Sequence, residues 1–517
     1  MNNIKILWVD DEIEFLKSQI LFLEDKGYTV DAVSNGHDAI DACKQTIYDI
    51  VFLDEHMPGI TGLETLAKLK EAHSDLPIVM ITKSEEENIM EEAIGSQIAD
   101  YLIKPVNPNQ ILLSLKKIID NKRLVKEKTT SGYQQDFQNI FAALGNDMTT
   151  KEWSELYQKL VYWEVEMDKS SSNDMQEVLT MQKQEANVEF SKFVTKNYFD
   201  WINQNTDDTP IMSDNLMQSL VFEHISDDTP IFFILIDNLR YDQFKIIQPL
   251  IQESFQMDSE EIFYSILPTT TQYSRNAIFA GLMPSEIEEN YPDLWVNDED
   301  EGGRNLHEET LFKHQIERLK LGTSISYTKI TNHNNGKKLE DNVLNLMNNQ
   351  LNVIVYNFVD MLSHARTEME VLKELASDER AYRSLCLSWF KHSPLHNALL
   401  KLSDKKVKII ITTDHGMVKV SQPSKVIADK KTTTNIRYKT GKNLNYEDKD
   451  VYVVNNPHDI FLPKQHMSSK FIFAKEDKYL VYPNNYNHFV NYFKNTFQHG
   501  GISMEEMMIP FAIFNNK

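Results

Sequence analysis

Residues 230–237 read PIFFILID, an unbroken apolar run that ends in a carboxylate. Such a run is typical of a strand that is buried on both faces of a parallel sheet. In sheets of this kind the functional side chains follow the carboxyl ends of the strands. The stretch therefore predicts an α/β fold for the C-terminal part of the chain and places Asp237 at a candidate site.

The same pattern recurs downstream, where residues 353–359 and 407–413 also run into carboxylates and histidines follow. The spacing of Asp360 and His364 lets both side chains face one point if a helix begins there. Carboxylates and imidazoles without thiols suit two Zn²⁺ ions, or Mn²⁺, and a metal pair about 3.5–4 Å apart is a common device for phosphoryl displacement. The candidate ligands are Asp237, Asp360, His364, Asp414, His415 and His499.

A hydroxyl nucleophile is available in LPTTTQYSR, residues 267–275. Thr271 is the candidate, because a metal would lower the pKa of its hydroxyl. Its neighbours Thr269 and Thr270 are alternatives for the same role. Arg275 follows one helical turn later, where it could bind a non-bridging phosphate oxygen.

The first 120 residues alternate short apolar runs with helical segments, which predicts a βα repeat and a doubly wound parallel sheet. Polar side chains again follow the strands, and three clustered carboxylates are expected to hold Mg²⁺. Taken singly these residues have ordinary explanations, such as strand-end loops, a Lys-Pro turn or a helix cap. The candidates are Asp10, Asp11, Asp54, Thr82 and Lys104, the last followed by Pro105.

Residues 121–208 show helical periodicity with little chemistry. Thr149 and Glu152 have the spacing of a capping box, so a helix is expected to begin there. We predict a three-helix unit from about residue 131 to 204, whose aromatic stripe forms core rather than a partner groove. A transmission or dimerisation role stays open. The expected domains are residues 1–120, 121–208 and 209–517.

Composition excludes several classes of protein. The 53 Lys and Arg against 77 Asp and Glu give a net charge of -24, which disfavours duplex DNA as a partner. Only Cys43 and Cys386 occur, so neither a disulfide framework nor a cysteine zinc site is expected. With no signal pattern and no apolar run of membrane-spanning length, a cytoplasmic protein that is not membrane-inserted is expected.

The N-terminal motifs resemble the response-regulator receiver domain: WVDDE at 8–12, FLDEHMPGITG at 52–62, MITK at 80–83 and YLIKP at 101–105. The resemblance implies Asp54 as phosphoacceptor, with Asp10 and Asp11 as Mg²⁺ ligands beside it. It implies Thr82 and Lys104 as the switch pair, and Tyr101 as the aromatic residue that responds to phosphorylation. A sensor histidine kinase is the implied partner.

The C-terminal phrases DNLRYDQ, PTTTQYSRNAIFAGL, TTDHGM and HGGISMEEMMIP resemble the PglZ branch of the alkaline phosphatase superfamily. Thr271 is implied as the nucleophile that bridges two zinc ions. The resemblance implies two ligand sets, Asp237, Thr271, Asp414 and His415 around one ion and Asp360, His364 and His499 around the other.

The whole chain is similar to the PorX-type response regulators. This similarity implies a zinc-dependent phosphodiesterase acting on small cyclic or linear oligonucleotides, dimerisation on phosphorylation, and regulation of type IX secretion. No Lys/Arg cluster surrounds the metal motifs, which favours a diester over a monoester. The alternative is a non-enzymatic adaptor whose metal site is structural or senses a nucleotide, and which binds a secretion-system subunit or a transcription factor. A DNA-binding regulator is disfavoured, because no helix-turn-helix pattern follows the receiver segment.

Overall fold

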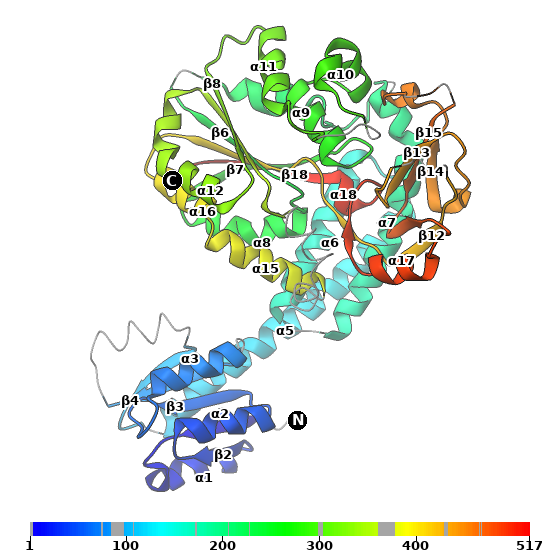
Figure 1. Cartoon of the computed structure of the whole chain (residues 1–517). Coiled ribbons are helices and arrows are strands. Elements are labelled where there is room, and N and C mark those ends of the chain that lie inside the picture. The colour runs from blue at the N-terminus through cyan, green and yellow to red at the C-terminus, as the bar shows by residue number, and fades with distance from the viewer. Residues whose placement is uncertain are drawn as a thin grey trace. The chain divides into compact units, whose positions relative to one another are not determined.

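The computed structural model describes residues 4–73, 76–83, 98–106, 108–170, 173–204, 206–226, 228–297, 303–359, 378–428, 433–464, 466 and 468–517 (Figure 1). The chain divides into two compact units, Met1–Gly132 and Tyr133–Lys517. Among the residues just given, no helix is both long and apolar enough to cross a membrane.

The first unit is built on a five-stranded parallel sheet in the order β2-β1-β3-β4-β5. Alternate residues of β1 face opposite sides, with Leu7 and Val9 in one apolar cluster and Ile6 and Trp8 in the other. The predicted doubly wound α/β fold is confirmed. Its elements are β1 (Lys5–Val9), α1 (Lys17–Asp25), β2 (Thr29–Val33), α2 (Gly36–Gln45), β3 (Ile50–Asp54), α3 (Gly62–Ala72), β4 (Ile78–Thr82) and β5 (Asp100–Ile103).

Three long helices follow: α5 (Pro108–Leu144), α6 (Thr150–Ser170) and α7 (Asn173–Ile202). The helical linker is confirmed, but its first helix begins at Pro108 rather than near residue 131. No proline interrupts residues 109–144, and a single Gly132 costs a helix only about 1 kcal/mol. The capping box that opens α6 is present, with Glu152 N 3.3 Å from Thr149 Oγ1 and Thr149 N 2.8 Å from Glu152 Oε2.

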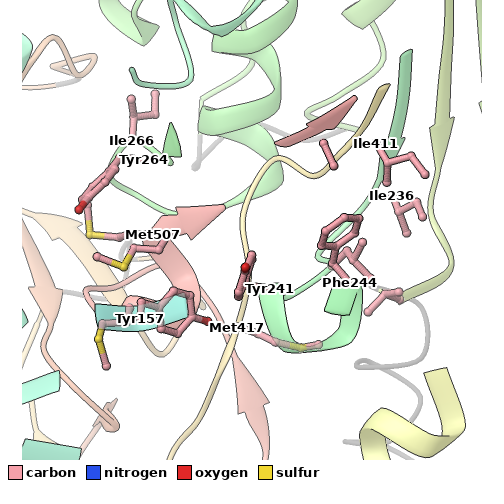
Figure 2. Packing of buried hydrophobic residues seen from close by; sticks show 14 of the residues in the cluster. Tyr157, Ile236, Tyr241, Phe244, Tyr264, Ile266, Ile411, Met417 and Met507 are labelled. Carbon is pink, nitrogen blue, oxygen red and sulfur yellow. The ribbon is translucent and has the colours of Figure 1, made fainter. Parts of the chain in front are cut away.

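The aromatic stripe of α6 is buried in the core of the second unit. Trp153 packs on Phe190 of α7 with ring centroids 5.3 Å apart. Tyr157 lies against Tyr241 of α8 with ring centroids 5.6 Å apart, and Figure 2 shows both side chains in the buried cluster that also contains Met507. The linker helices thus share one hydrophobic core with the C-terminal part of the chain.

The second unit contains a six-stranded mixed sheet in the order β7-β18-β10-β6-β9-β8. The strands β10, β6, β9 and β8 run parallel, while β18 pairs antiparallel with β10 and β7. The strands are β6 (Ile231–Ile236), β7 (Phe255–Tyr264), β8 (Ile325–Ile330), β9 (Leu351–Tyr356), β10 (Lys408–Thr412) and β18 (Met508–Asn516).

Helices and small sheets surround this central sheet (Figure 1). The helices are α8 (Tyr241–Gln252), α9 (Asn276–Ala280), α10 (Pro284–Asn290), α11 (Glu308–Arg318), α12 (His333–Asn342), α15 (Glu379–Lys391), α16 (Pro394–Leu402), α17 (Tyr486–Phe493) and α18 (Met504–Met507). The short strands are β11 (Val418–Lys419), β12 (Gln422–Lys425), β13 (Tyr438–Gly441), β14 (Val451–Val454), β15 (Lys470–Ala474), β16 (Lys478–Val481) and β17 (Phe497–Gln498).

Candidate functional site

The carboxyl ends of β6 and β10 bring the first predicted ligands together. The two strands are adjacent and parallel, with Leu235 opposite Thr412, so both chains leave the sheet at the same edge. Asp237, Asp414 and His415 each offer one ligand atom, and these atoms lie within 4.8 Å of one another. All three side chains are buried.

The hydroxyl of Thr271 faces this group. Thr271 is the first residue of a short π-helix, Thr271–Arg275. Its Oγ1 lies 3.1 Å from His415 Nε2 and 3.4 Å from Asp237 Oδ1. The Nδ1 of His415 is 3.0 Å from the carbonyl oxygen of Gly416, which can only accept. Nδ1 therefore carries the proton, and the lone pair of Nε2 points toward Thr271 and the carboxylates.

The two preceding threonines have different surroundings. Thr269 Oγ1 donates to the carbonyl oxygen of Gly501 at 3.0 Å and accepts from the amide of Gly500 at 3.0 Å. Thr270 Oγ1 is buried and has no hydrogen-bond partner in the part of the chain that the structure describes. This geometry favours Thr271 over its neighbours as the reactive hydroxyl.

The glycines after His499 let the backbone pass close to other groups. Gly500 has φ +125°, and a Cβ there would lie 2.9 Å from Tyr438 Cδ1. A Cβ at Gly501 would lie 2.7 Å from Arg437 Nη2. The loop brings the His499 ring onto the His415 ring, with centroids 4.4 Å apart and planes 21° from parallel. His499 therefore lies beside the first ligand group.

Arg275 is fully buried and pairs with acidic side chains. Its Nε lies 3.0 Å from Asp414 Oδ2, its Nη2 pairs with Asp237 Oδ2, and its Nη1 lies 3.4 Å from Glu308 Oε1. Burial opposes ionisation of Asp414, but Arg275 and His415 outweigh it and lower the pKa of that carboxyl to about 2. Asp414 is therefore an anion at neutral pH, as a metal ligand must be.

These donors fit one zinc ion. Two carboxylates and one imidazole nitrogen are ligands that Zn²⁺ accepts, and Arg275 occupies the Oδ2 atoms of Asp237 and Asp414, which leaves their Oδ1 atoms toward Thr271 and Asn238. Asp360 and His364, predicted as ligands of a second ion, lie outside the described residues. His499 is the one member of that set whose position is described.

The first unit contains a second acidic group, formed at the carboxyl ends of β1 and β3. Ligand atoms of Asp10, Asp11 and Asp54 lie within 4.8 Å of one another; Asp10 and Asp54 are buried and Asp11 is exposed. The Lys104 ammonium lies 2.8 Å from Asp10 Oδ2 and 3.1 Å from Asp54 Oδ1. Burial and the charge of Asp10 raise the pKa of Asp54, although Lys104 opposes the shift. An acidic triad of this kind is typical of Mg²⁺.

Thr82 and Tyr101, also predicted for the site at Asp10, Asp11 and Asp54, lie in the neighbouring strands β4 and β5. Thr82 is buried at the end of β4, and its hydroxyl donates to Glu55. Tyr101 is partly buried in β5 and packs against the apolar cluster that contains Leu53 and Met80. The peptide bond between Lys104 and Pro105 is cis.

Sequence reasoning missed Glu308 and Asn305. Glu308 begins α11 and is 2% exposed, while Asn305 Nδ2 donates to the carbonyl oxygen of Thr271 at 2.9 Å. Neither residue follows a buried strand, so the strand-end pattern could not point to them.

Models of three known protein families match successive segments of this chain. A model of the PglZ alkaline phosphatase-like domain of BREX systems matches residues 216–514, which is more than half of the chain. A model of the PorX response regulator linker domain matches residues 123–202, and one of the response regulator receiver domain matches residues 6–116. The chain belongs to the PorX-type response regulators.

Curated relatives of this PorX-type regulator include the transcriptional regulatory protein ResD of Bacillus subtilis, 33% identical over 118 residues, which are 23% of this chain and 49% of ResD. Another is the transcriptional regulatory protein SrrA of Staphylococcus aureus, 31% identical over 115 residues, which are 22% of this chain and 47% of SrrA. The chain spans about half the length of the curated relatives it matches.

Among solved structures, the chemotaxis protein CheY4 of Vibrio cholerae is 27% identical, with 22% of this chain and 98% of that chain covered and a TM-score of 0.22. A receiver domain protein from Clostridium thermocellum is 24% identical, with 23% and 98% covered and a TM-score of 0.23.

Proposed function

We propose that the output domain of this response regulator is a zinc-dependent phosphodiesterase that acts on small cyclic or linear oligonucleotides. The observation that carries the proposal is the position of the Thr271 hydroxyl, 3.1 Å from His415 Nε2 and beside the carboxylates of Asp237 and Asp414. The match to an alkaline phosphatase-like domain supports a phosphoesterase.

In the proposed reaction Thr271 Oγ1 attacks phosphorus and its proton passes to solvent. The bond from phosphorus to the departing alcohol oxygen breaks, and that oxygen takes up a proton from solvent. Water then cleaves the phosphothreonine and restores the hydroxyl. Asp237, Asp414 and His415 would hold one zinc ion, and Asp360, His364 and His499 a second. Bound zinc would lower the pKa of the Thr271 hydroxyl and neutralise charge on the phosphoryl oxygens.

Arg275 has a different role in this proposal from the phosphate contact predicted from sequence spacing. Its guanidinium is buried against Asp237, Asp414 and Glu308. A buried fork of donors holds both carboxylates in the orientation that a metal requires. Binding of a phosphate oxygen by Arg275 stays a prediction.

The receiver domain implies a cognate histidine kinase. We propose that this kinase phosphorylates Asp54 with Mg²⁺ bound by Asp10, Asp11 and Asp54, and that Thr82, Lys104 and Tyr101 respond. Phosphorylation then favours a homodimer, and the regulator acts on type IX secretion. The division into residues 1–120, 121–208 and 209–517 is part of this proposal.

The test compares two isosteric variants, Thr271→Val and Thr270→Val, on a diester, a monoester and short oligonucleotides, with zinc measured in each protein. Thr271→Val should lower kcat at least about 10³-fold with zinc retained, because it removes the nucleophile. Thr270→Val should keep wild-type turnover, since its hydroxyl makes no hydrogen bond among the residues described. Equal activity in both variants contradicts the assignment, and a zinc-loaded wild type without turnover favours the adaptor.

A further inference from the structure

We infer that helix α7 of the linker positions both loops of the candidate active site through one row of polar side chains. The catalytic consequence rests on the proposed function, whereas the contacts themselves do not. Lys183, Asn187 and Ser191 are spaced four residues apart, and Tyr198 follows seven residues later, so all four lie on one face of the helix. Each is 7% exposed or less.

The N-terminal part of this row, Lys183 and Asn187, holds the segment that follows His499. Asn187 Nδ2 donates to Glu505 Oε2 at 2.9 Å, and Asn187 Oδ1 accepts from the amide of Met504 at 2.8 Å. The Lys183 ammonium lies 3.0 Å from the other Glu505 carboxylate oxygen. One turn of α7 therefore holds both side-chain oxygens of Glu505 and the backbone beside it.

The segment held in this way contacts the loop that carries two candidate ligands. A Cβ on Gly416 would overlap the carbonyl oxygen of Glu505, so the two backbones touch. The amide of Gly416 donates to the carbonyl oxygen of Glu506 at 3.2 Å. Glu506 Oε1 also accepts from the amide of Gly501 at 2.9 Å. Displacement of residues 501–506 would therefore move the backbone on either side of the site, next to His415 and next to His499.

The C-terminal end of the row, Tyr198, holds the loop that leads to Thr271, the proposed nucleophile. The Tyr198 hydroxyl accepts from the amide of Leu267 at 2.8 Å, and Tyr198 is fully buried. Leu267 precedes Thr271 by four residues. The same helix thus contacts the strand-to-helix loop of Thr271 and the segment after His499.

Helix α5 contacts α7 next to this row. The Tyr133 hydroxyl donates to Gln182 Oε1 at 3.0 Å, and Gln182 Nε2 donates to the carbonyl oxygen of Phe137 at 3.0 Å. Gln182 is the neighbour of Lys183 in the chain. Because in-line attack tolerates little displacement of the reacting groups, a small shift of α7 would change the rate without any residue of α7 touching substrate.

The first test removes one contact at a time and measures hydrogen–deuterium exchange of residues 499–507 and 266–271 in the full-length protein. Asn187→Leu is compared with Asn197→Leu, because Asn197 lies on the same helix and donates to the carbonyl oxygen of Phe193 one turn earlier, at 2.9 Å. Tyr198→Phe is compared with Tyr157→Phe, whose buried hydroxyl has no partner among the residues that the structure describes.

Asn187→Leu should raise exchange in residues 499–507, and Tyr198→Phe should raise it at residues 266–271, about 10-fold relative to the matched control. On a diester, both variants should lower kcat about 10-fold or more with KM changed less than about 2-fold, as for loss of a supporting contact. The double variant Asn187→Asp/Glu505→Gln restores a hydrogen-bond donor and acceptor at these two positions. It should recover part of the kcat that Asn187→Asp alone loses.

The inference is overturned if Asn187→Leu and Tyr198→Phe show the same hydrogen–deuterium exchange in both loops, and the same kcat, as their control variants. Tyr198→Phe removes a single oxygen, so it keeps the test decisive if Asn187→Leu does not fold. If the wild-type protein hydrolyses no ester, the proposed function fails, while the exchange measurements still decide whether α7 holds the two loops.

Discussion

At the scale of single residues, the surroundings of a side chain decide its chemistry more than its type does. Thr269, Thr270 and Thr271 are identical in covalent structure, yet their surroundings differ. Thr269 hydrogen-bonds to Gly500 and Gly501, and the buried hydroxyl of Thr270 has no partner among the residues described. Thr271 faces the candidate ligands. Only the last has an acceptor imidazole and carboxylates that favour loss of its proton. The order of the sequence motifs predicts Thr271 as the nucleophile, and its contacts with His415 and Asp237 are compatible with that prediction.

The buried side chain of Lys439 predicts how the free energy of unfolding depends on pH. Its ammonium is buried 2.8 Å from the carbonyl oxygen of Thr433 and over the Tyr482 ring, and burial lowers the pKa of Lys439 to about 7. Between about pH 7 and 10.5 the unfolded chain binds a proton that the folded chain does not. The free energy of unfolding should therefore rise with pH across this window, by up to about 1.4 kcal/mol per pH unit from this group.

Urea denaturation at several pH values would measure this slope in the wild type and in Lys439→Met. The variant should have a smaller slope between pH 7 and 10, and the exposed Lys442→Met serves as control. Identical slopes in Lys439→Met and the wild type would contradict the depressed pKa.

At the scale of elements, buried charge joins the linker helices to the output domain. Lys183 of α7 lies 3.0 Å from Glu164 of α6 and 3.0 Å from Glu505 of α18. The attraction of these carboxylates outweighs burial and raises the pKa of Lys183, so the ammonium stays charged. Removing one partner of a buried ion pair is strongly destabilising, because the remaining charge loses its compensation.

Lys183→Met should therefore lower the free energy of unfolding by about 3–5 kcal/mol, because it leaves the buried carboxylate of Glu505 without its cation and removes the closer cation from Glu164. Lys192→Met makes the same change on the exposed face of α7, where Lys192 pairs with Glu189 one turn away, and should cost less than about 0.5 kcal/mol. Chemical denaturation of both variants measures the difference. Equal losses would show that the Lys183 contacts add nothing.

At the scale of the whole molecule, one chain joins a receiver domain with a candidate phosphoacceptor site to a domain with a candidate hydrolytic site, through the linker helices. The Lys104 ammonium already bridges Asp10 and Asp54, so a phosphoryl group on Asp54 would compete for the same cation. The negative charge of the chain, -24, favours separate copies, so a dimer needs a specific signal.

Asp54→Asn should abolish the dimerisation that a small phosphoryl donor and Mg²⁺ induce, as measured by sedimentation velocity. Its zinc content should equal that of the wild type, since the candidate zinc ligands belong to the other compact unit. Asp41→Asn, an exposed change on α2, is the control. A variant that still dimerises in response to the donor would contradict the proposed switch.

Much of this architecture was determined by the sequence alone, because apolar runs ended by Asp10, Asp54, Asp237 and Asp414 predict buried parallel strands whose ends carry function. Local chemistry was equally readable in the capping box of Thr149 and Glu152. Only the tertiary structure decided the burial of Arg275 against three carboxylates and the contacts of α7 with two distant loops. Periodicity shows which face of an element is buried, but not which partner packs there, because that partner lies up to 318 residues away in the chain.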